Sequence, residues 1–224
     1  MPYEYYAMKS IVGLVPNGTS ILDVGANIGN HSLFWAASGH RVVAFEPNPA
    51  ALVWLKQNKA RNEFGDWIDV RPFGLGAASG RAIVVPLSAG NLGKTSTELS
   101  DTGTVEIHTL DSLQLPDEIG AIKIDVEGGE ADVLRGALGT LHRHKPVIMI
   151  ELWNKQAVVI ANNLLRPLGY RQLPFIIGGG PTYLFLPGWR KLLSALRSGS
   201  TLWAGIRVKV SRGRRWLRTY ASRS

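Results

Sequence analysis

Residues 20–30 read Ser-Ile-Leu-Asp-Val-Gly-Ala-Asn-Ile-Gly-Asn. The apolar run over residues 20–24 predicts a buried strand that passes directly into a glycine-rich turn, and residues 31–38 continue as a helix with one apolar face. Glycine lets the backbone turn sharply and lets a ligand approach the main chain. In an open α/β sheet, a loop of this kind at the carboxyl end of a strand is where nucleotide-like ligands bind.

The rest of the body repeats this alternation of strand and helix. Strands are predicted over residues 41–45, 68–73, 121–126 and 146–152, and helices over residues 50–62, 130–142 and 155–168. Such alternation is typical of βαβ crossover units. We therefore expect a Rossmann-like α/β fold, with helices on both faces of a mostly parallel sheet.

Two stretches depart from the alternation. Residues 74–109 are rich in Gly, Ser and Thr, and alternating patterns over residues 81–87 and 104–109 predict an extra β-hairpin joined by a polar loop, residues 88–103. Near the end of the body, residues 170–173 and 183–186 predict a second hairpin around the glycines at 178–180.

Composition and charge divide the chain into a body, residues 1–187, and a basic tail, residues 188–224. The chain has no cysteine, which excludes a disulfide framework, a thiolate nucleophile and a Cys-based zinc site. No acidic residue follows Glu151, whereas ten of the 25 Lys and Arg residues lie in the tail. We expect a cytoplasmic protein without a signal peptide or transmembrane segment.

The tail interleaves tryptophan and leucine with its basic residues, as in Trp189, Trp203 and Trp216. This pattern is typical of an interfacial anchor on an anionic membrane surface, so peripheral attachment at the inner face of the membrane is one hypothesis. A solvated or domain-packing tail is the other. RNA binding would use similar residues, but we do not expect a nucleic acid partner.

The glycine loop and its acidic neighbours predict the cofactor. A dinucleotide site calls for Gly-x-Gly-x-x-Gly, whereas this loop has Gly25-x-Asn27-x-Gly29. The carboxylate of Asp23 would repel a diphosphate but attract an ammonium or sulfonium group: two unit charges ~4 Å apart interact by roughly 4 kcal/mol at an effective dielectric constant of about 20. Glu46 ends the second strand, where a carboxylate can accept hydrogen bonds from ribose hydroxyls. We therefore predict S-adenosyl-L-methionine as the cofactor.

A second polar group interrupts the buried strand at residues 121–126. Lys123, Asp125 and Glu127 alternate with apolar residues and are expected on one face near the cofactor crevice. Asp125 or Glu127 is a candidate general base, with Lys123 holding the carboxylate by charge pairing and His31 as a second proton acceptor or acceptor-pocket residue. A structural Lys123–Asp125 pair, and a hard cation on Asp125 and Glu127, are the alternatives. We assign no metal.

Four stretches resemble the FkbM family of methyltransferases: residues 23–31, 45–47, 109–113 and 122–130. Residues 134–137 and the stretch from Pro146 to Glu151 also fit this family. The most specific is Lys-Ile-Asp-Val-Glu-Gly-Gly-Glu, residues 123–130. The resemblance implies a class I methyltransferase fold with a seven-stranded sheet whose last strand is antiparallel. It also implies O-methylation of hydroxyls on sugars, polyketides or similar metabolites. In the segment that begins at Gly74, relatives often carry an Asp near Ala77 that can meet the adenine amino group, and here backbone groups or Ser79 would take that part.

We thus expect a methyltransferase that O-methylates a glycan or another small-molecule acceptor. An N-methyltransferase is the alternative within the class, although the Asn/Asp-Pro-Pro-Tyr/Phe tetrapeptide of many amino-directed enzymes is absent. An NAD-dependent oxidoreductase and a noncatalytic nucleotide-binding module are the alternatives outside it. Asp23 and Asn27 argue against the oxidoreductase.

Overall fold

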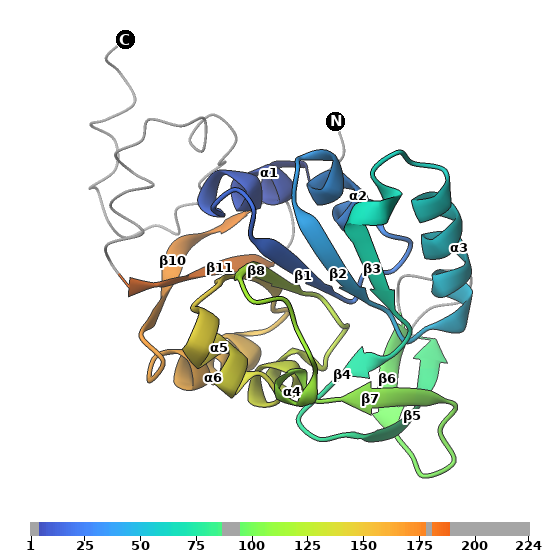
Figure 1. Ribbon diagram of the computed structural model, residues 1–224. Coiled ribbons are helices and arrows are strands. Elements are labelled where there is room, and N and C mark those ends of the chain that lie inside the picture. Colours follow the sequence, from blue (N-terminus) through green and yellow to red (C-terminus); the bar gives the residue numbers. More distant parts are fainter. Residues whose placement is uncertain (1–4, 87–94, 178–180, 189–224) are drawn as a thin grey trace.

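The computed structural model describes residues 5–86, 95–177 and 181–188, and its centre is a seven-stranded sheet (Figure 1). The strands are β1 (Ser20–Val24), β2 (Arg41–Phe45), β3 (Ile68–Arg71), β8 (Ile119–Ile124), β9 (Val147–Glu151), β10 (Tyr170–Ile177) and β11 (Thr182–Pro187). Their order is β10-β11-β9-β8-β1-β2-β3, and only β11 runs antiparallel to its neighbours. The predicted fold, including its antiparallel last strand, is confirmed.

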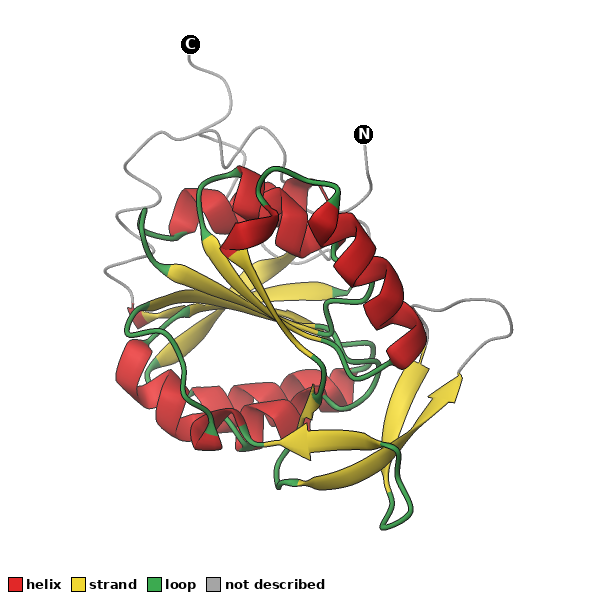
Figure 2. Ribbon diagram, turned by 45° about the vertical axis from the view of Figure 1, so that its right-hand side comes forward, coloured by secondary structure: helices red, strands yellow, loops and turns green. Residues whose placement is uncertain are grey.

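Helices cover both faces of this sheet (Figures 1 and 2). One face carries α1 (Tyr5–Leu14), α2 (Asn30–Ala37) and α3 (Pro49–Ala60), and the other carries α4 (Glu130–Arg135), α5 (Leu138–His144) and α6 (Lys155–Leu165). Two buried apolar clusters follow from this layering, one centred on residues such as Trp35 and Leu55 and one on residues such as Phe45 and Leu134. The helix α1 was not predicted from the sequence.

A smaller sheet projects from one side of the domain (Figure 2). It contains β4 (Gly74–Leu75), β5 (Gly80–Pro86), β6 (Thr95–Leu99) and β7 (Val105–His108) in the order β4-β7-β5-β6. The predicted pairing of the strands at β5 and β7 is confirmed. The prediction of a polar loop over residues 88–103 is wrong over β6, which pairs with β5. An edge strand whose side chains are mostly exposed shows no apolar alternation, so its sequence resembles a loop.

The predicted helix over residues 130–142 is in fact two helices, α4 and α5, separated at Gly136 and Ala137. The main-chain oxygen of Gly136 accepts a hydrogen bond from Asp111 N at 2.9 Å. A Cβ atom at Gly136 would overlap the main-chain oxygen of Gly76. The chain therefore breaks where it packs against the loop between β4 and β5 of the smaller sheet, a contact that local periodicity does not reveal.

The side chain of Asp111, in the short 3₁₀ helix Leu110–Ser112, has a structural role. Its carboxylate accepts hydrogen bonds from Gly139 N at 2.8 Å, from Thr140 N at 2.7 Å and from Thr140 Oγ1 at 2.7 Å. These donors lie in the first turn of α5, whose amide groups have no partner within the helix. Asp111 therefore holds the start of α5 in place.

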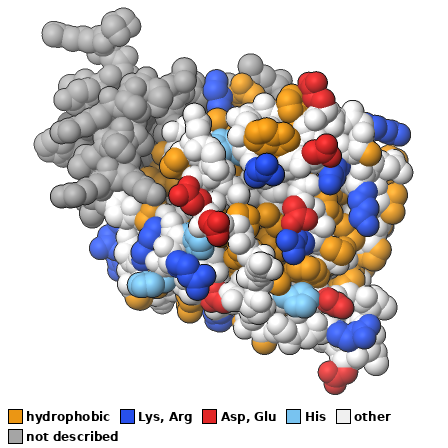
Figure 3. Space-filling view, in the orientation of Figure 1, with side chains coloured by type: hydrophobic (Ala, Val, Ile, Leu, Met, Phe, Trp, Pro, Cys, Tyr) orange, Lys and Arg blue, Asp and Glu red, His pale blue; other side chains and the backbone are white. Residues whose placement is uncertain are grey.

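The surface of the body mixes charges of both signs (Figure 3). Acidic and basic side chains alternate over the face in view, consistent with the near balance of charge that the sequence shows before the tail. In the part of the chain that the structure describes, no helix is both long and apolar enough to cross a membrane. The basic tail, from Trp189 onward, lies outside the described residues.

Candidate active site

The turn after β1 lies directly against the end of β8. Gly25, Asn27 and Gly29 all have positive φ angles, of 78°, 51° and 90°. Gly25 N and Ala26 N both donate to Phe45 O at 3.0 Å, which ties the turn to the end of β2. A Cβ atom at Gly25 would overlap the main-chain oxygen of Asp125. Glycine is required there because the two chains approach too closely for a side chain.

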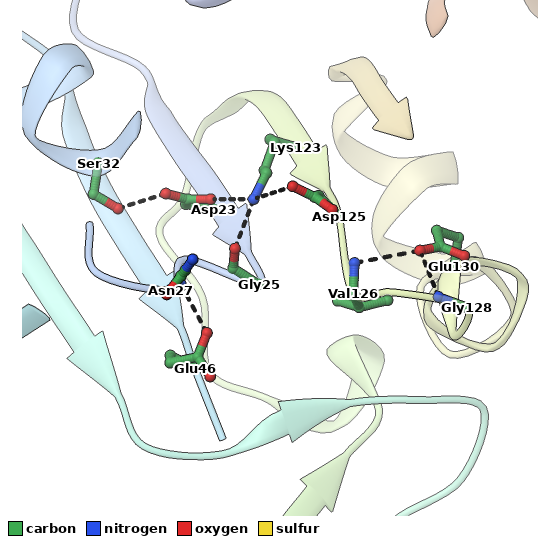
Figure 4. Close-up of polar contacts among 10 residues, drawn as sticks. All are labelled: Asp23, Gly25, Asn27, Ser32, Glu46, Lys123, Asp125, Val126, Gly128 and Glu130. Atoms are coloured by element: carbon green, nitrogen blue, oxygen red, sulfur yellow. Dashed lines mark hydrogen bonds and ion pairs between the residues drawn. The ribbon is translucent and has the colours of Figure 1, made fainter. Parts of the chain in front are cut away.

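Behind this turn lies a buried cluster of charges (Figure 4). Lys123 Nζ donates to Gly25 O at 2.6 Å and lies 3.3 Å from Asp23 Oδ1 and 3.5 Å from Asp125 Oδ2. Ser32 Oγ donates to Asp23 Oδ2 at 2.6 Å. Burial by itself lowers the pKa of Lys123, but the charges of Asp23 and Asp125 outweigh burial and hold that pKa above its ordinary value. Lys123 is therefore a permanent cation between two carboxylates.

This cluster changes the interpretation of Asp23. Its side chain is completely buried and does not line the cofactor-side pocket described below. It faces Lys123 from the neighbouring strand, in register with it. Asp23 is thus placed to position Lys123.

Glu46, at the end of β2, holds the far side of the turn. Its Oε2 accepts from Asn27 N at 2.7 Å and its Oε1 accepts from Asn48 N at 2.8 Å. Burial raises the pKa of Glu46 above its ordinary value, although these two backbone bonds oppose the rise. Each oxygen retains acceptor capacity, because an ionised carboxylate offers about four lone-pair sites.

A first pocket, the cofactor-side pocket, opens over these groups. Four of the predicted cofactor residues line it, namely Gly25, Asn27, Glu46 and Gly74. Asp125 and Glu127 line it as well. Gly29 does not, because it forms the turn that begins α2 and packs against Leu55.

The smaller sheet contributes two residues to the same pocket. Thr95 and Thr97 of β6 line its wall. Sequence reasoning missed them because their segment was assigned to a loop. Their alternation with Ser96, which is the spacing of residues on one face of a strand, is the signal that could have found them.

The loop that follows β8 is held in place by Glu130. The strand ends at Ile124, so Glu127 does not continue the strand face as predicted but lies in a turn with φ of 55°. The buried carboxylate of Glu130 accepts from Val126 N at 3.3 Å and from Gly128 N at 3.0 Å (Figure 4). These bonds fix the backbone that carries Glu127 at the pocket rim.

A second pocket, the acceptor-side pocket, lies next to the first. Its lining includes Ala7 of α1, His31 of α2, Lys123 and Asp125 at the end of β8, Glu151 at the end of β9 and Thr182 of β11. Asp125 belongs to both pockets. The ring of His31 stacks on that of Trp35, with centroids 5.4 Å apart and planes 18° apart, which orients the imidazole.

Glu151 is the residue of this site that sequence reasoning missed. Burial raises its pKa to about 8, and the charge of Asp125, a hydrogen bond with Asp125 and the charge of Glu127 contribute to the rise. The available signal was the position of Glu151. It ends β9, and Asp125 follows the end of β8, the neighbouring parallel strand, so the two residues lie at the same edge of the sheet. Within residues 5–86, 95–177 and 181–188, no group of three or more His, Cys, Asp or Glu side chains is arranged to hold a metal ion.

Comparisons with known proteins identify the family of the chain. The model of the methyltransferase FkbM domain matches residues 23–171, which is more than half of the chain. The hexuronic acid methyltransferase AglP of Haloferax volcanii is 36% identical over 134 residues, which cover 57% of this chain and 53% of that protein. The chain therefore matches about half the length of this relative.

Two solved structures share the fold. An FkbM methyltransferase from Methylobacillus flagellatus KT superposes with a TM-score of 0.56 at 23% identity, covering 75% of this chain and 43% of that one. A putative rRNA methylase from Clostridium thermocellum superposes with a TM-score of 0.55 at 11% identity, covering 83% of this chain and 94% of that one. With the glycine turn, the two pockets and the matched domain in agreement, the chain belongs to the FkbM family of methyltransferases.

Proposed function

We propose that this protein is an S-adenosylmethionine-dependent methyltransferase that O-methylates a hydroxyl of a glycan or another small molecule. The observation that carries the proposal is the meeting of two pockets at Asp125. A methyl donor in one pocket and an acceptor in the other would bring the reacting atoms together beside this carboxylate. Such alignment supplies much of what a methyl transfer requires.

The charge of the cofactor-side pocket supports the donor. Its described lining contains Glu46, Asp125 and Glu127 and no Lys or Arg. This lining favours a ligand with a sulfonium and an ammonium group over one with a diphosphate. When bound, S-adenosylmethionine supplies a methyl group already activated by its sulfonium.

The polar groups of the pocket fit the rest of that ligand. Asn27 Oδ1 is buried and has no hydrogen-bond partner among the described residues, so it is available to a hydroxyl, amino or ammonium donor. Glu46 lies where ribose hydroxyls would meet a carboxylate, with Gly25 and Gly74 leaving room for the ligand against the main chain.

The predicted catalytic residues take distinct roles in this proposal. Asp125 orients the acceptor at the junction of the pockets, and Lys123 positions Asp125 from behind. Glu127 adds negative charge on the cofactor side, while His31 lines the acceptor side. A sugar acceptor is consistent with the relative that is named a hexuronic acid methyltransferase.

Calorimetric titration with S-adenosylmethionine, its demethylated product and NAD tests the cofactor. We expect the first two ligands to bind and NAD not to bind. We expect the Glu46→Gln variant to bind S-adenosylmethionine about 10–100-fold more weakly, since hydrogen bonds to a charged group contribute roughly 1.5–3 kcal/mol. Glu118→Gln is the matched control, because Glu118 is exposed just before β8, at the opposite end of that strand from Asp125.

Binding of NAD without binding of S-adenosylmethionine would contradict the proposal and favour an oxidoreductase. If wild type and Glu46→Gln bound S-adenosylmethionine with equal affinity, Glu46 would not contact the cofactor. The methyltransferase activity would then be tested separately.

We further propose, from the sequence, that residues 1–187 form a cytoplasmic catalytic domain and that residues 188–224 attach it to an anionic membrane surface. Liposome flotation of the whole chain and of a variant ending at residue 187 tests this attachment. We expect anionic vesicles to carry the whole chain upward and to leave the shortened chain behind, because Lys and Arg contribute about 1 kcal/mol each near such a surface. Equal flotation of both proteins would dispose of the anchor.

A further inference from the structure

We propose that the acceptor-side pocket binds a neutral hydroxyl and that Glu151, coupled to Asp125, takes the proton of that hydroxyl. The inference rests on the proposed methyltransferase function and adds the residue that completes its chemistry. Glu151 lies within the residues that the family model matches but was not among the predicted site residues.

Strand order brings the two carboxyl groups together. β8 and β9 are parallel neighbours, with Ile124 in register with Ile150, so Asp125 and Glu151 follow at the same edge of the sheet. Glu151 is half-buried, and both side chains line the acceptor-side pocket. Two negative charges at one site repel each other, so the second carboxyl group loses its proton less readily than the first. The pair therefore retains one proton after the first carboxyl group has ionised.

The surroundings decide which carboxyl carries that proton. Asp125 lies 3.5 Å from Lys123 Nζ, a cation that remains charged, so the negative charge of the pair is best placed on Asp125. Burial, the charge of Asp125 and the charge of Glu127 raise the pKa of Glu151 to about 8, and the charge of Lys123 opposes them with a smaller effect. The proton therefore resides on Glu151 and leaves it near pH 8.

Apart from Lys123, the described residues that line the pocket include no Lys or Arg. Thr182, which is in register with Glu151 on β11, and Ala7 of α1 are uncharged. His31 of α2 is the other titratable group that lines the pocket with Asp125 and Lys123. A base that titrates near the working pH is the most effective kind, because it is partly ionised and still binds a proton well.

The transfer then balances as follows. The acceptor O–H bond breaks and its proton passes to the ionised carboxylate of Glu151. The acceptor oxygen forms a bond to the methyl carbon, and the carbon–sulfur bond of the donor breaks with its electron pair remaining on sulfur. The products are a methyl ether and a neutral thioether.

Stability as a function of pH tests the proton on Glu151 without any acceptor. The pKa of Glu151 is raised from 4.5 to about 8 by folding, so its contribution to stability is present below about pH 4.5 and is lost as pH rises through about 8. Glutamine at 151 stays neutral and can still donate to Asp125. We expect the Glu151→Gln variant to unfold at a higher urea concentration than wild type at about pH 9 and to approach wild type near pH 5.

The control for this measurement is Glu118→Gln, which removes a carboxylate that is exposed and remote from the pair. It should shift the urea midpoint equally at all pH values. If the urea midpoints of wild type and Glu151→Gln changed in parallel with pH, Glu151 would not carry the proton, and the proposal would be overturned.

The rate of methyl transfer tests whether Glu151 is the base. The acceptors are methyl β-glucoside, which offers only hydroxyl groups, and methyl β-glucuronide, which carries a carboxylate as well. We expect the wild-type rate to rise with pH through about 8 as Glu151 ionises, and Glu151→Gln to lower kcat by about 10²–10⁴-fold while its affinity for S-adenosylmethionine is unchanged. A rate that instead falls through the same pH range, with transfer to the glucuronide alone, would overturn the base and indicate methylation of a carboxylate. If the wild-type protein did not bind S-adenosylmethionine in the calorimetric titration, the proposed function itself would fail. That titration is independent of the kinetic test of Glu151.

Discussion

Replacing Lys123 with methionine is expected to lower the free energy of unfolding by about 3–5 kcal/mol, the usual cost of removing one partner of a buried ion pair. The side chain of Lys123 is 4% exposed and that of Asp23 is completely buried. Without the ammonium group, Asp23 keeps a buried charge whose described partner is a single serine hydroxyl. The Gly25 carbonyl also loses its donor, so the turn after β1 loosens. Urea denaturation followed by circular dichroism measures the loss.

Two controls separate this charge effect from a loss of packing. The double variant Asp23→Asn/Lys123→Met should recover a large part of the loss, because it no longer buries an uncompensated carboxylate. Lys155→Met changes an exposed lysine at the start of α6 and should leave stability within about 0.5 kcal/mol of wild type. A double variant no more stable than Lys123→Met would show that the cost lies in packing and not in charge.

Replacing Gly25 with alanine is expected to abolish measurable S-adenosylmethionine binding and to destabilise the fold. An alanine with φ of 78° has a backbone cost of roughly 1–2 kcal/mol, and overpacking typically adds 1–3 kcal/mol. The overlap is with the main-chain oxygen of Asp125, so no side-chain rotation can relieve it. The turn and the end of β8 must separate, which displaces Asp125, the residue that lines both pockets.

Gly39 provides the matched control, since it also has a positive φ, of 88°, but a Cβ atom there meets nothing within 4 Å. Gly39→Ala should show only the backbone cost of roughly 1–2 kcal/mol and should bind S-adenosylmethionine like wild type. Calorimetry and thermal denaturation of the two variants make the comparison. Equal ligand binding by both variants would show that the close approach of Gly25 to Asp125 is not needed by the cofactor site.

The differences between prediction and structure share one cause. The break at Gly136 depends on a contact with Gly76, far away in the chain, and the strand β6 depends on pairing with the preceding strand β5. Helical periodicity over residues 130–142 and polar composition over residues 88–103 describe only neighbours in sequence. Such patterns are overruled where a tertiary contact requires another backbone path.

The sequence by itself determined the α/β class, the positions along the chain of the strands that form the body, the glycine turn and the acidic end of β8. These features are visible because hydrophobic period and turn chemistry are properties of adjacent residues. The partners of those residues were decided by the tertiary structure. Lys123 and Gly25, 98 positions apart in the chain, are hydrogen-bonded. Asp23 pairs with Lys123 instead of lining the pocket, and Glu151 lies beside Asp125. Each of these pairings depends on which strands lie side by side and in what register, and so on the packing of the whole sheet.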